Sequence, residues 1–379
     1  MHEVLAQLAA VVDVLLHKKG MADHRVTLVV PTPSGLAMTP YHHALIAPHS
    51  LYAPVSFDDM STRTQRPNSP VPWSEEGHVS CFERAVYCKF YAFPQGVVDT
   101  ARTLLRGMLP LLPTNPLGFG AAGSGQPAPQ PLPPLVEDTT FRVAIEARSG
   151  ATRSFKNLHA IIDECAEMNK RGFRAGRFTS IACRVLHTGD TPDLHGLARF
   201  YANLGAVRSA HLLVAVHGAG ASNSAFMEEG GHAGVLEIRP CRFGTEFCHW
   251  PNAYMYAQLQ RTDFSIRFFA LNLADPNQCA PPDYEAEHLA NPDTVPLRGP
   301  DDHRARDQHV MPNPKQLLEY MRRVGTMLSD QAAYDEANRA DKLHAYALPD
   351  GLVYGSLCVE DEAKLQTMEK QPILRLQKK

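Results

Sequence analysis

The stretch "LLVAVHGAGASNSAFMEEGGHAGVLEIRP", residues 212–240, has the order of a strand, a Gly-rich turn, a helix and a second strand. Its first five residues are apolar, as in a strand that a parallel sheet buries on both faces. The turn that follows has almost no side-chain bulk and consists of His217, Gly218, Ala219 and Gly220. A ligand can therefore approach the backbone closely where the expected helix begins, with Ser222 or Asn223 as its cap. Free N–H groups at a helix start favour an anion, so the turn is a candidate phosphate site.

An acidic residue follows this turn at a spacing typical of nucleotide sites. Glu237 lies at the end of the next expected strand, "GVLEI". Its distance along the chain from His217, about twenty residues, resembles that of the acid that holds ribose hydroxyls in mononucleotide-binding units. We therefore expect Glu237 to bind the ribose of a nucleotide. The alternative is that its carboxylate pairs with Arg239 or Arg242.

Two better-known signatures are absent from the stretch. It contains neither GxGxxG nor GxxxxGK[ST], so it predicts neither a dinucleotide fingerprint nor a P-loop. The sequence HGAG is also close to the turn that supplies oxyanion-hole N–H groups in some α/β-hydrolases, which makes an esterase the alternative from another class. That fold needs a GxSxG nucleophile elbow, and the sequence has none.

Strands and helices are expected to alternate regularly on both sides of this stretch. The apolar patterns predict strands at 141–147, 178–186 and 264–270 and helices at 155–170, 194–208 and 247–259. Strands separated by helices imply parallel crossovers, so an α/β fold with a doubly wound sheet is expected.

Three segments carry a resemblance to a known family. "VHGAGASNSAFMEEGG" followed by "VLEIRP" resembles the signature of glycosyltransferase family 61, "IEARSGATRSFKN" resembles its Arg-rich turn ending in Asn, and "CFERAVYCKF" resembles a segment of its N-terminal half. The likeness covers residues 25–267. It implies an inverting, nucleotide-sugar-dependent transferase with two Rossmann-like domains facing a cleft (GT-B-like), the C-terminal one nucleotide-binding and doubly wound.

The resemblance implies roles for individual residues. Arg148 and Arg153 flank a strand-to-helix turn, where a guanidinium can fork onto a diphosphate. Arg153 and His217 are the implied catalytic residues, Arg153 stabilising the departing phosphate and His217 donating to it or orienting the sugar. The implied donor-binding residues are Arg148, Arg153, Asn157, His217, Gly218, Ala219, Gly220, Asn223 and Glu237. The residues leave the general base open among Asp58, Asp59, His78 and Glu83.

Expected partners follow from charge and motifs. The family resemblance implies a UDP-sugar donor and a glycan or glycoprotein acceptor. No Asp-x-Asp lies at a strand end, so we expect neither a metal ion nor another cofactor. The net charge of −3, with acids and bases nearly balanced, gives no basic field for nucleic acid. A Gln that is common in the family before the HGAG strand is absent, which keeps open an inactive transferase-like protein that only binds nucleotide or glycan.

Composition predicts four parts of the chain. These are an acceptor-side α/β domain at 1–110, a Pro/Gly-rich linker or insertion at 111–135, a nucleotide-sugar domain at 136–275, and a polar segment with C-terminal helices at 276–379. In GT-B enzymes such a C-terminal helix often crosses back to the first domain.

The N-terminal segment and the cysteines bear on the cellular compartment of the protein. The N-terminal twenty residues are too short in apolar length for a membrane span and predict an amphipathic surface helix. The family resemblance implies a Golgi or endomembrane lumen, with membrane contact only through an anchor outside this chain. Cys165 and Cys183 lie in apolar contexts and are expected to be buried thiols. No cysteine spacing is that of a zinc site, and disulfide connectivity stays open.

Overall fold

The chain forms two compact units, described separately below. A computed structural model describes residues 27–30, 38, 40–50, 52–56, 97–119, 132–148, 152–189, 193–241, 243, 265–281, 306–340, 342–348 and 353–355. The first unit comprises Met1–Leu111 and Leu194–Ala198, and the second Leu112–Asp193 and Arg199–Lys379.

Short elements make up the described part of the first unit. They are β1 (Val29–Val30), α2 (Pro40–Ile46), η2 (Ala47–His49), β2 (Val55–Ser56), α4 (Val97–Met108) and η3 (Leu109–Leu111). β1 and β2 pair in parallel. In α4, Ala101, Leu104 and Met108 recur at helical spacing and are buried. A complete Rossmann-like first domain stays a prediction, because most of residues 57–96 lie outside the described part.

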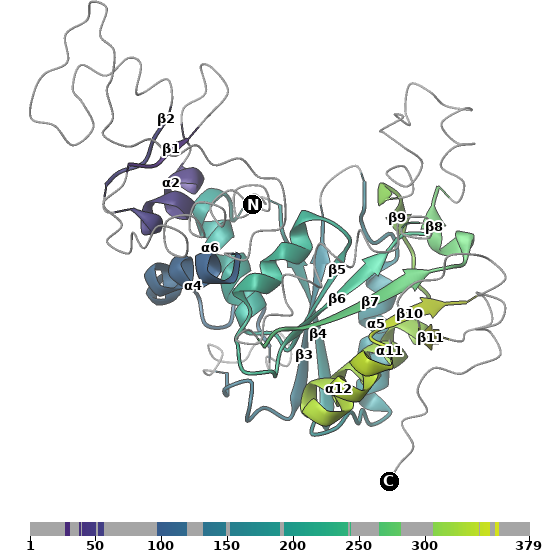
Figure 1. Ribbon diagram of the computed structural model, residues 1–379. Coiled ribbons are helices and arrows are strands. Elements are labelled where there is room, and N and C mark those ends of the chain that lie inside the picture. Colours follow the sequence, from purple (N-terminus) through teal and green to yellow (C-terminus); the bar gives the residue numbers. More distant parts are fainter. Residues whose placement is uncertain are drawn as a thin grey trace, which may run out of the picture. The chain divides into compact units, whose positions relative to one another are not determined.

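A mostly parallel sheet of seven strands organises the second unit (Figure 1). Its strands are β3 (Thr140–Ala147), β4 (Ser180–His187), β5 (Leu212–Val216), β6 (Gly234–Arg239), β7 (Arg267–Leu273), β10 (His344–Ala347) and β11 (Val353–Gly355). They lie in the order β11-β10-β7-β6-β5-β3-β4. Strands β3, β4, β5, β6, β7 and β10 pair in parallel, and β11 is antiparallel to β10. The sheet therefore confirms the predicted α/β class.

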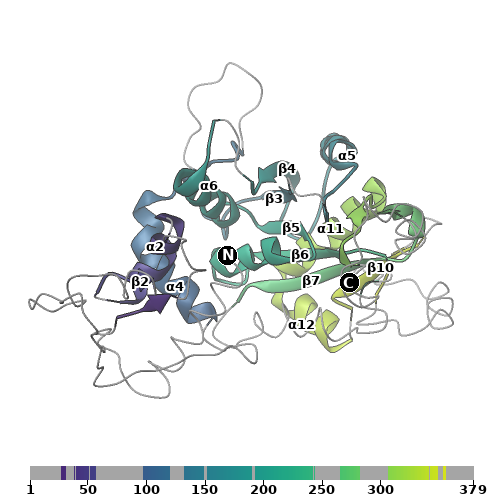
Figure 2. The same cartoon turned by 90° about the horizontal axis from the view of Figure 1, so that it is seen from above.

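Helices cover both faces of this sheet. The longer ones are α5 (Leu158–Lys170), α6 (Gly196–Arg208), α11 (Pro314–Ser329) and α12 (Gln331–Arg339), and the short elements are η4 (Ala219–Phe226), η6 (Pro276–Gln278), β8 (Cys279–Ala280) and β9 (His309–Val310). Figure 2 shows α5 and α11 on one side of the sheet and α6 on the other. The helix expected at 247–259 lies outside the described residues.

The two faces of the sheet differ in chemistry. Alternate residues of each strand, among them Val143, Val214 and Leu236, point to the face covered by α5 and α11 and form one hydrophobic cluster with those helices. Burying one such side chain stabilises the fold by about 1.5–3 kcal/mol. The opposite face carries buried polar side chains near the strand ends, among them Glu146, Glu237, Arg239 and Asn272. The polar face holds the candidate site.

The C-terminal part belongs to this unit. Residues 276–379 were expected to form a polar segment with C-terminal helices, of a kind that in GT-B enzymes often crosses back to the first domain. In the described part, β10 pairs with β7 in the sheet, and the apolar face of α11, including Leu317, Tyr320 and Val324, is buried in the core. No helix in the described ranges is long and apolar enough to cross a membrane.

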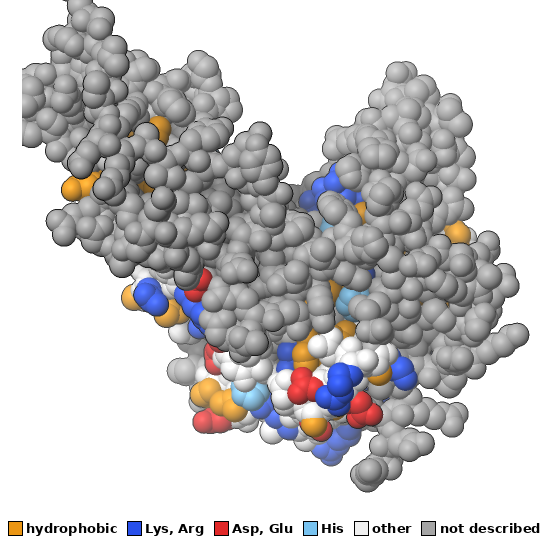
Figure 3. Space-filling view, viewed as in Figure 1, with side chains coloured by type: hydrophobic (Ala, Val, Ile, Leu, Met, Phe, Trp, Pro, Cys, Tyr) orange, Lys and Arg blue, Asp and Glu red, His pale blue; other side chains and the backbone are white. Residues whose placement is uncertain are grey.

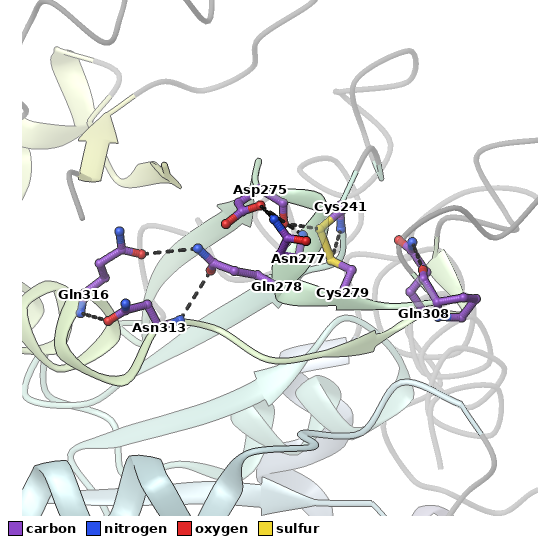
Figure 4. Close-up of a disulfide and its surroundings, with 9 residues drawn as sticks. Cys241, Asp275, Asn277, Gln278, Cys279, Gln308, Asn313 and Gln316 are labelled. Atoms are coloured by element: carbon purple, nitrogen blue, oxygen red, sulfur yellow. Dashed lines mark hydrogen bonds between the residues drawn. A yellow bond between two sulfur atoms is a disulfide. The ribbon is translucent and has the colours of Figure 1, made fainter. Parts of the chain in front are cut away.

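Two disulfides tie the second unit together. Cys165 of α5 and Cys183 of β4 are bonded, with their Cα atoms 6.3 Å apart. The prediction of buried thiols at these positions was therefore wrong about the thiols, although both residues are buried. Cys241 after β6 is bonded to Cys279 of β8 (Figure 4). Beside it, the side chain of Gln278 accepts from Asn313 N–H at 3.4 Å, which ties η6 to the start of α11.

Candidate anion site at the sheet switch point

The strand order places one position of the sheet where ligands usually bind. From β3 the chain moves to β4 on one side, and then returns to β5 on the other side of β3. In open α/β sheets, ligands bind beyond the carboxyl ends of the two strands at such a reversal. The Arg148–Arg153 turn follows β3 and the HGAG turn follows β5, so both predicted motifs border this position. Figure 3 shows Lys or Arg side chains, coloured blue, in the upper part of the view and around the lower part of the described surface.

The HGAG turn leads into a 3-10 helix. Gly218 is the residue before η4, with φ 146° and ψ −170°, a conformation that is essentially restricted to glycine. No side chain caps η4. The prediction of an α-helix capped by Ser222 or Asn223 was therefore wrong, because both residues lie buried inside η4.

The space beside the turn's glycines is occupied by the protein's own side chains. A methyl group added to Gly218 would lie 2.8 Å from Arg148 Nη1 and 2.9 Å from Arg153 Nη1. A methyl group added to Gly220 would overlap the carboxylate of Glu146. The glycines thus admit two guanidinium groups and a carboxylate, rather than leaving the backbone open to a ligand as the sequence predicted. A ligand at this position meets the arginines.

Arg153 adopts a strained backbone conformation. Its φ of 56° is the only positive value at a non-glycine residue in the part of the chain that is described. A left-handed conformation costs such a residue about 1–2 kcal/mol, so neighbouring contacts must hold it. Asp307, which is 2% exposed, supplies one of them: its Oδ1 lies 3.3 Å from Arg153 Nε and 3.3 Å from Arg306 Nε. Burial, and next the neighbouring charge of Arg148, lower the pKa of Arg153.

Residues from β9 and the start of α11 hold the same turn. The backbone of Phe155 forms a bridge with Val310. Ser154 Oγ lies 2.7 Å from His309 Nδ1. Asn157 donates from Nδ2 to the carbonyl oxygen of Pro312 at 2.8 Å. Asn157 therefore ties the turn to the residues before α11, and the donor-binding role that the family resemblance implied stays a prediction.

His217 and Glu237 form a buried pair behind the turn. His217 Nδ1 lies 2.6 Å from Glu237 Oε1, and Arg239 Nε donates to Glu237 Oε2 at 2.8 Å. Arg239 Nη1 reaches Asn272 Oδ1 at 3.4 Å. Since Glu237 is 0% exposed and bonds through both oxygens, the structure favours the alternative pairing with Arg239 and not the ribose role.

The charges in this pair are fixed by its surroundings. Burial alone would raise the pKa of Glu237, but the charge of Arg239 and the hydrogen bonds from His217 and Arg239 outweigh it and hold that pKa at about 2. Burial lowers the pKa of His217, against the attraction of Glu237. At neutral pH Glu237 is therefore ionised and His217 neutral. A carboxylate can only accept a hydrogen bond, so the proton of His217 is on Nδ1 and Nε2 is an acceptor.

Glu146 was missed by the sequence reasoning. It is 2% exposed and is the second-last residue of β3. Its Oε2 has no hydrogen-bond partner among the described residues. Burial raises its pKa to about 7, while Arg148, a hydrogen bond from Thr188, and Arg153 oppose that rise. A signal was present: an acid lies near the end of a mostly apolar strand, two residues before an arginine of the predicted site.

The structure thus sorts the predicted residues into groups. Arg148 and Arg153 converge on Gly218, close to Ala219 and Gly220, while His217 and Glu237 form the pair behind them. Asn223 is buried within η4, with Oδ1 unpaired in the described part. The proposed bases Asp58, Asp59, His78 and Glu83 lie outside the described residues. Within the described ranges, no three His, Cys, Asp or Glu side chains are grouped to hold a metal ion.

Comparison with known proteins adds no assignment. Neither the models of known protein families nor the curated proteins that were searched contain a match to this chain.

Proposed function

We propose that this protein is an inverting glycosyltransferase that takes its sugar from a nucleoside diphosphate sugar, with UDP as the nucleotide, and transfers it to a hydroxyl group of a glycan or glycoprotein. The observation that carries the proposal is the convergence of two guanidinium groups at Gly218, at the switch point of the sheet. Arg148 Nη1 is buried there without a hydrogen-bond acceptor among the described residues.

Like charges that meet in this way call for an anion. Two guanidiniums near one point repel each other, and an unpaired buried N–H costs about 1–3 kcal/mol. A phosphate group would remove both penalties, because it accepts charge-assisted bonds from several donors at once. A diphosphate is favoured over a monophosphate because two guanidinium groups converge at this position.

The proposed chemistry is a single displacement at the anomeric carbon. The acceptor hydroxyl forms the new bond to that carbon as the bond to the diphosphate breaks, and the hydroxyl proton passes to a base. Negative charge grows on the departing phosphate, where Arg148 and Arg153 are already in place to stabilise it. Preorganised donors of this kind are typically worth about 3 kcal/mol each in the transition state.

His217 would act as an uncharged partner. With its Nδ1 proton held by Glu237, it adds no positive charge to the site. Glu237 would then be a positioning residue for His217, since it fixes which ring nitrogen carries the proton.

A lumenal setting is part of the proposal. Two disulfides close loops within the second unit, and disulfides persist mainly in oxidising compartments. An endomembrane lumen such as the Golgi would satisfy this condition and supply glycan acceptors. The reaction is proposed to need no metal ion, because arginines take the role of the cation at the diphosphate.

Binding of nucleotide sugars to the whole chain tests the proposal. A thermal-shift screen of UDP-glucose, UDP-xylose, UDP-N-acetylglucosamine and GDP-mannose should stabilise the protein with the UDP donors, by about 2.7 kcal/mol at 100 times the dissociation constant. Slow release of UDP without an acceptor should follow, since water can replace the acceptor hydroxyl.

A matched pair of arginine variants locates the site. At a fixed donor concentration Arg153→Ala should reduce the shift, whereas Arg174→Ala, which removes an exposed arginine in the turn after α5, should leave it unchanged. Stabilisation by none of the donors, or equal stabilisation of both variants, would refute the proposal. Binding without any release of UDP would instead support the inactive transferase-like alternative.

A further inference from the structure

A buried acid stands among the arginines of the anion site. Glu146 lies on the polar face of β3 and its carboxylate packs against the backbone of Gly220. Arg148 and Arg153, from the turn after β3, and Thr188, after β4, are the charged or hydrogen-bonding groups that act on it. The group of η4 that faces the Glu146 carboxylate is the backbone of Gly220.

The charges of this cluster balance only in part. Arg148, Arg153 and Arg306 bring three positive charges, and Asp307 neutralises one of them through its bonds to Arg153 and Arg306. Glu146 supplies a second negative charge only when it has lost its proton. Without a ligand, the two nearby guanidiniums compensate a buried carboxylate that has one oxygen unpaired.

An anionic ligand changes that balance. A diphosphate bound to Arg148 and Arg153 would place two further negative charges beside Glu146 and occupy the guanidiniums that compensate it. A buried carboxylate near like charge favours its neutral form, because both burial and repulsion disfavour ionisation. The neutral acid can also donate a hydrogen bond to a phosphate oxygen, which the carboxylate cannot do.

We propose that Glu146 takes up one proton when a diphosphate binds to Arg148 and Arg153, so that the site binds anion and proton together. This inference rests on the proposed function. The proton comes from the solvent and returns to it when the nucleotide leaves. Glu146 acts as a positioning residue for the two arginines and as a selector for ligands of high negative charge.

The pKa of Glu146 supports a linkage near neutral pH. Burial raises that pKa to about 7, so the free protein is partly protonated there. Burial lowers the pKa of His217, so its imidazole is neutral above pH 7, where the affinity should fall. If binding requires the protonated acid, affinity should be constant at low pH and should fall by about tenfold for each pH unit above about 7.

Calorimetric titration of the full chain tests the inference. UDP-glucose is the first probe, because its diphosphate diester keeps the same charge across the range, and sulfate is the second. The wild type should bind both more weakly as pH rises. Titrations in buffers of different ionisation enthalpy should show uptake of about half a proton near pH 7, where the free acid is half protonated, and of nearly one proton well above pH 7. Glu146→Gln should bind UDP-glucose without proton uptake and without the fall in affinity at high pH.

A control variant and a second measurement accompany this test. Glu167→Gln removes an exposed carboxylate of α5 and should behave as the wild type. If Glu146→Gln fails to fold, the measurement of proton uptake by the wild type still tests the proposal, because absence of uptake would contradict it.

The outcomes separate the two proposals. UDP-glucose binding with no proton uptake and no pH dependence would overturn the role of Glu146 and leave the transferase proposal standing. Proton-linked binding of sulfate without any binding of UDP-glucose would support the role of Glu146 and overturn the nucleotide. Failure of both probes to bind at every pH would overturn both.

Discussion

Replacing Gly218 by alanine separates backbone strain from displacement of the arginines. The added methyl group would meet Arg148 Nη1 at 2.8 Å and Arg153 Nη1 at 2.9 Å, closer than a carbon atom tolerates. Both atoms are side-chain ends that can move, so we expect the guanidiniums to shift rather than the fold to break. The backbone at φ 146° adds a strain of about 1–3 kcal/mol.

The size of the effect on binding follows from the hydrogen bonds that are lost. A hydrogen bond to a charged group contributes about 1.5–3 kcal/mol, so losing one between a guanidinium and the diphosphate should weaken UDP-glucose by about ten- to a hundredfold. Gly172→Ala is the matched control. Gly172 also has a positive φ, 91°, but an added methyl group meets nothing within 4 Å.

Two measurements on each variant complete the test. Urea unfolding should show comparable losses of stability for Gly218→Ala and Gly172→Ala, since backbone strain is common to both. Calorimetry should show weaker UDP-glucose binding for Gly218→Ala alone. If Gly218→Ala is destabilised but binds as tightly as the wild type, the guanidiniums at Gly218 do not hold the phosphate, and the reasoning behind the site fails.

Further predictions concern the site and the unit around it. Arg153→Ala should lower kcat by about a hundredfold, more than it weakens donor binding, and Arg153→Lys should recover only part of it, because a point charge cannot replace a fork; steady-state kinetics check both. Transfer should persist in excess chelator, and a loss that manganese restores would assign the diphosphate to a metal ion. Cys279→Ser opens a loop of 38 residues and should lower the free energy of unfolding by about 4 kcal/mol, measured in denaturant without reductant. Glu237 has a pKa held at about 2, below its usual 4.5, so its contribution to stability is present above pH 4.5 and is lost as pH falls toward 2; Glu237→Gln should remove this acid dependence in unfolding curves.

Local patterns predicted the central elements well. The run "LLVAV" lies between a helix end and a Gly-rich turn, and β5 has the predicted bounds. β3, α5, β4, α6, β6 and β7 also formed, with ends shifted by a few residues. Strands buried on both faces leave a continuous apolar signal, which short-range reading detects.

Long-range contacts decided what could not be predicted. β10 contains His344 and Tyr346, so its residues "HAYA" show no apolar run, and only its pairing with β7 makes it a strand. The contact between Asp307 and Arg153 could not be predicted either, because the two residues lie far apart in the sequence. The groups beside Gly218 and Gly220 could not be predicted either. A glycine in a sequence shows that space is left there, but not which side chain occupies that space.

The bonds that hold the Arg153 turn have a consequence for synthesis. Ser154 and its partner His309 are 155 residues apart, and Asp307 is almost as far along the chain from Arg153. At a translation rate of about 5–20 residues per second, the turn emerges from the ribosome about 8–30 s before these partners exist. During that interval the nascent chain has its arginines but not the contacts that hold Arg153 in its strained conformation. Ribosome-bound chains that end before residue 306 should therefore show no affinity for nucleotide, even where the Gly-rich turn is already outside the tunnel.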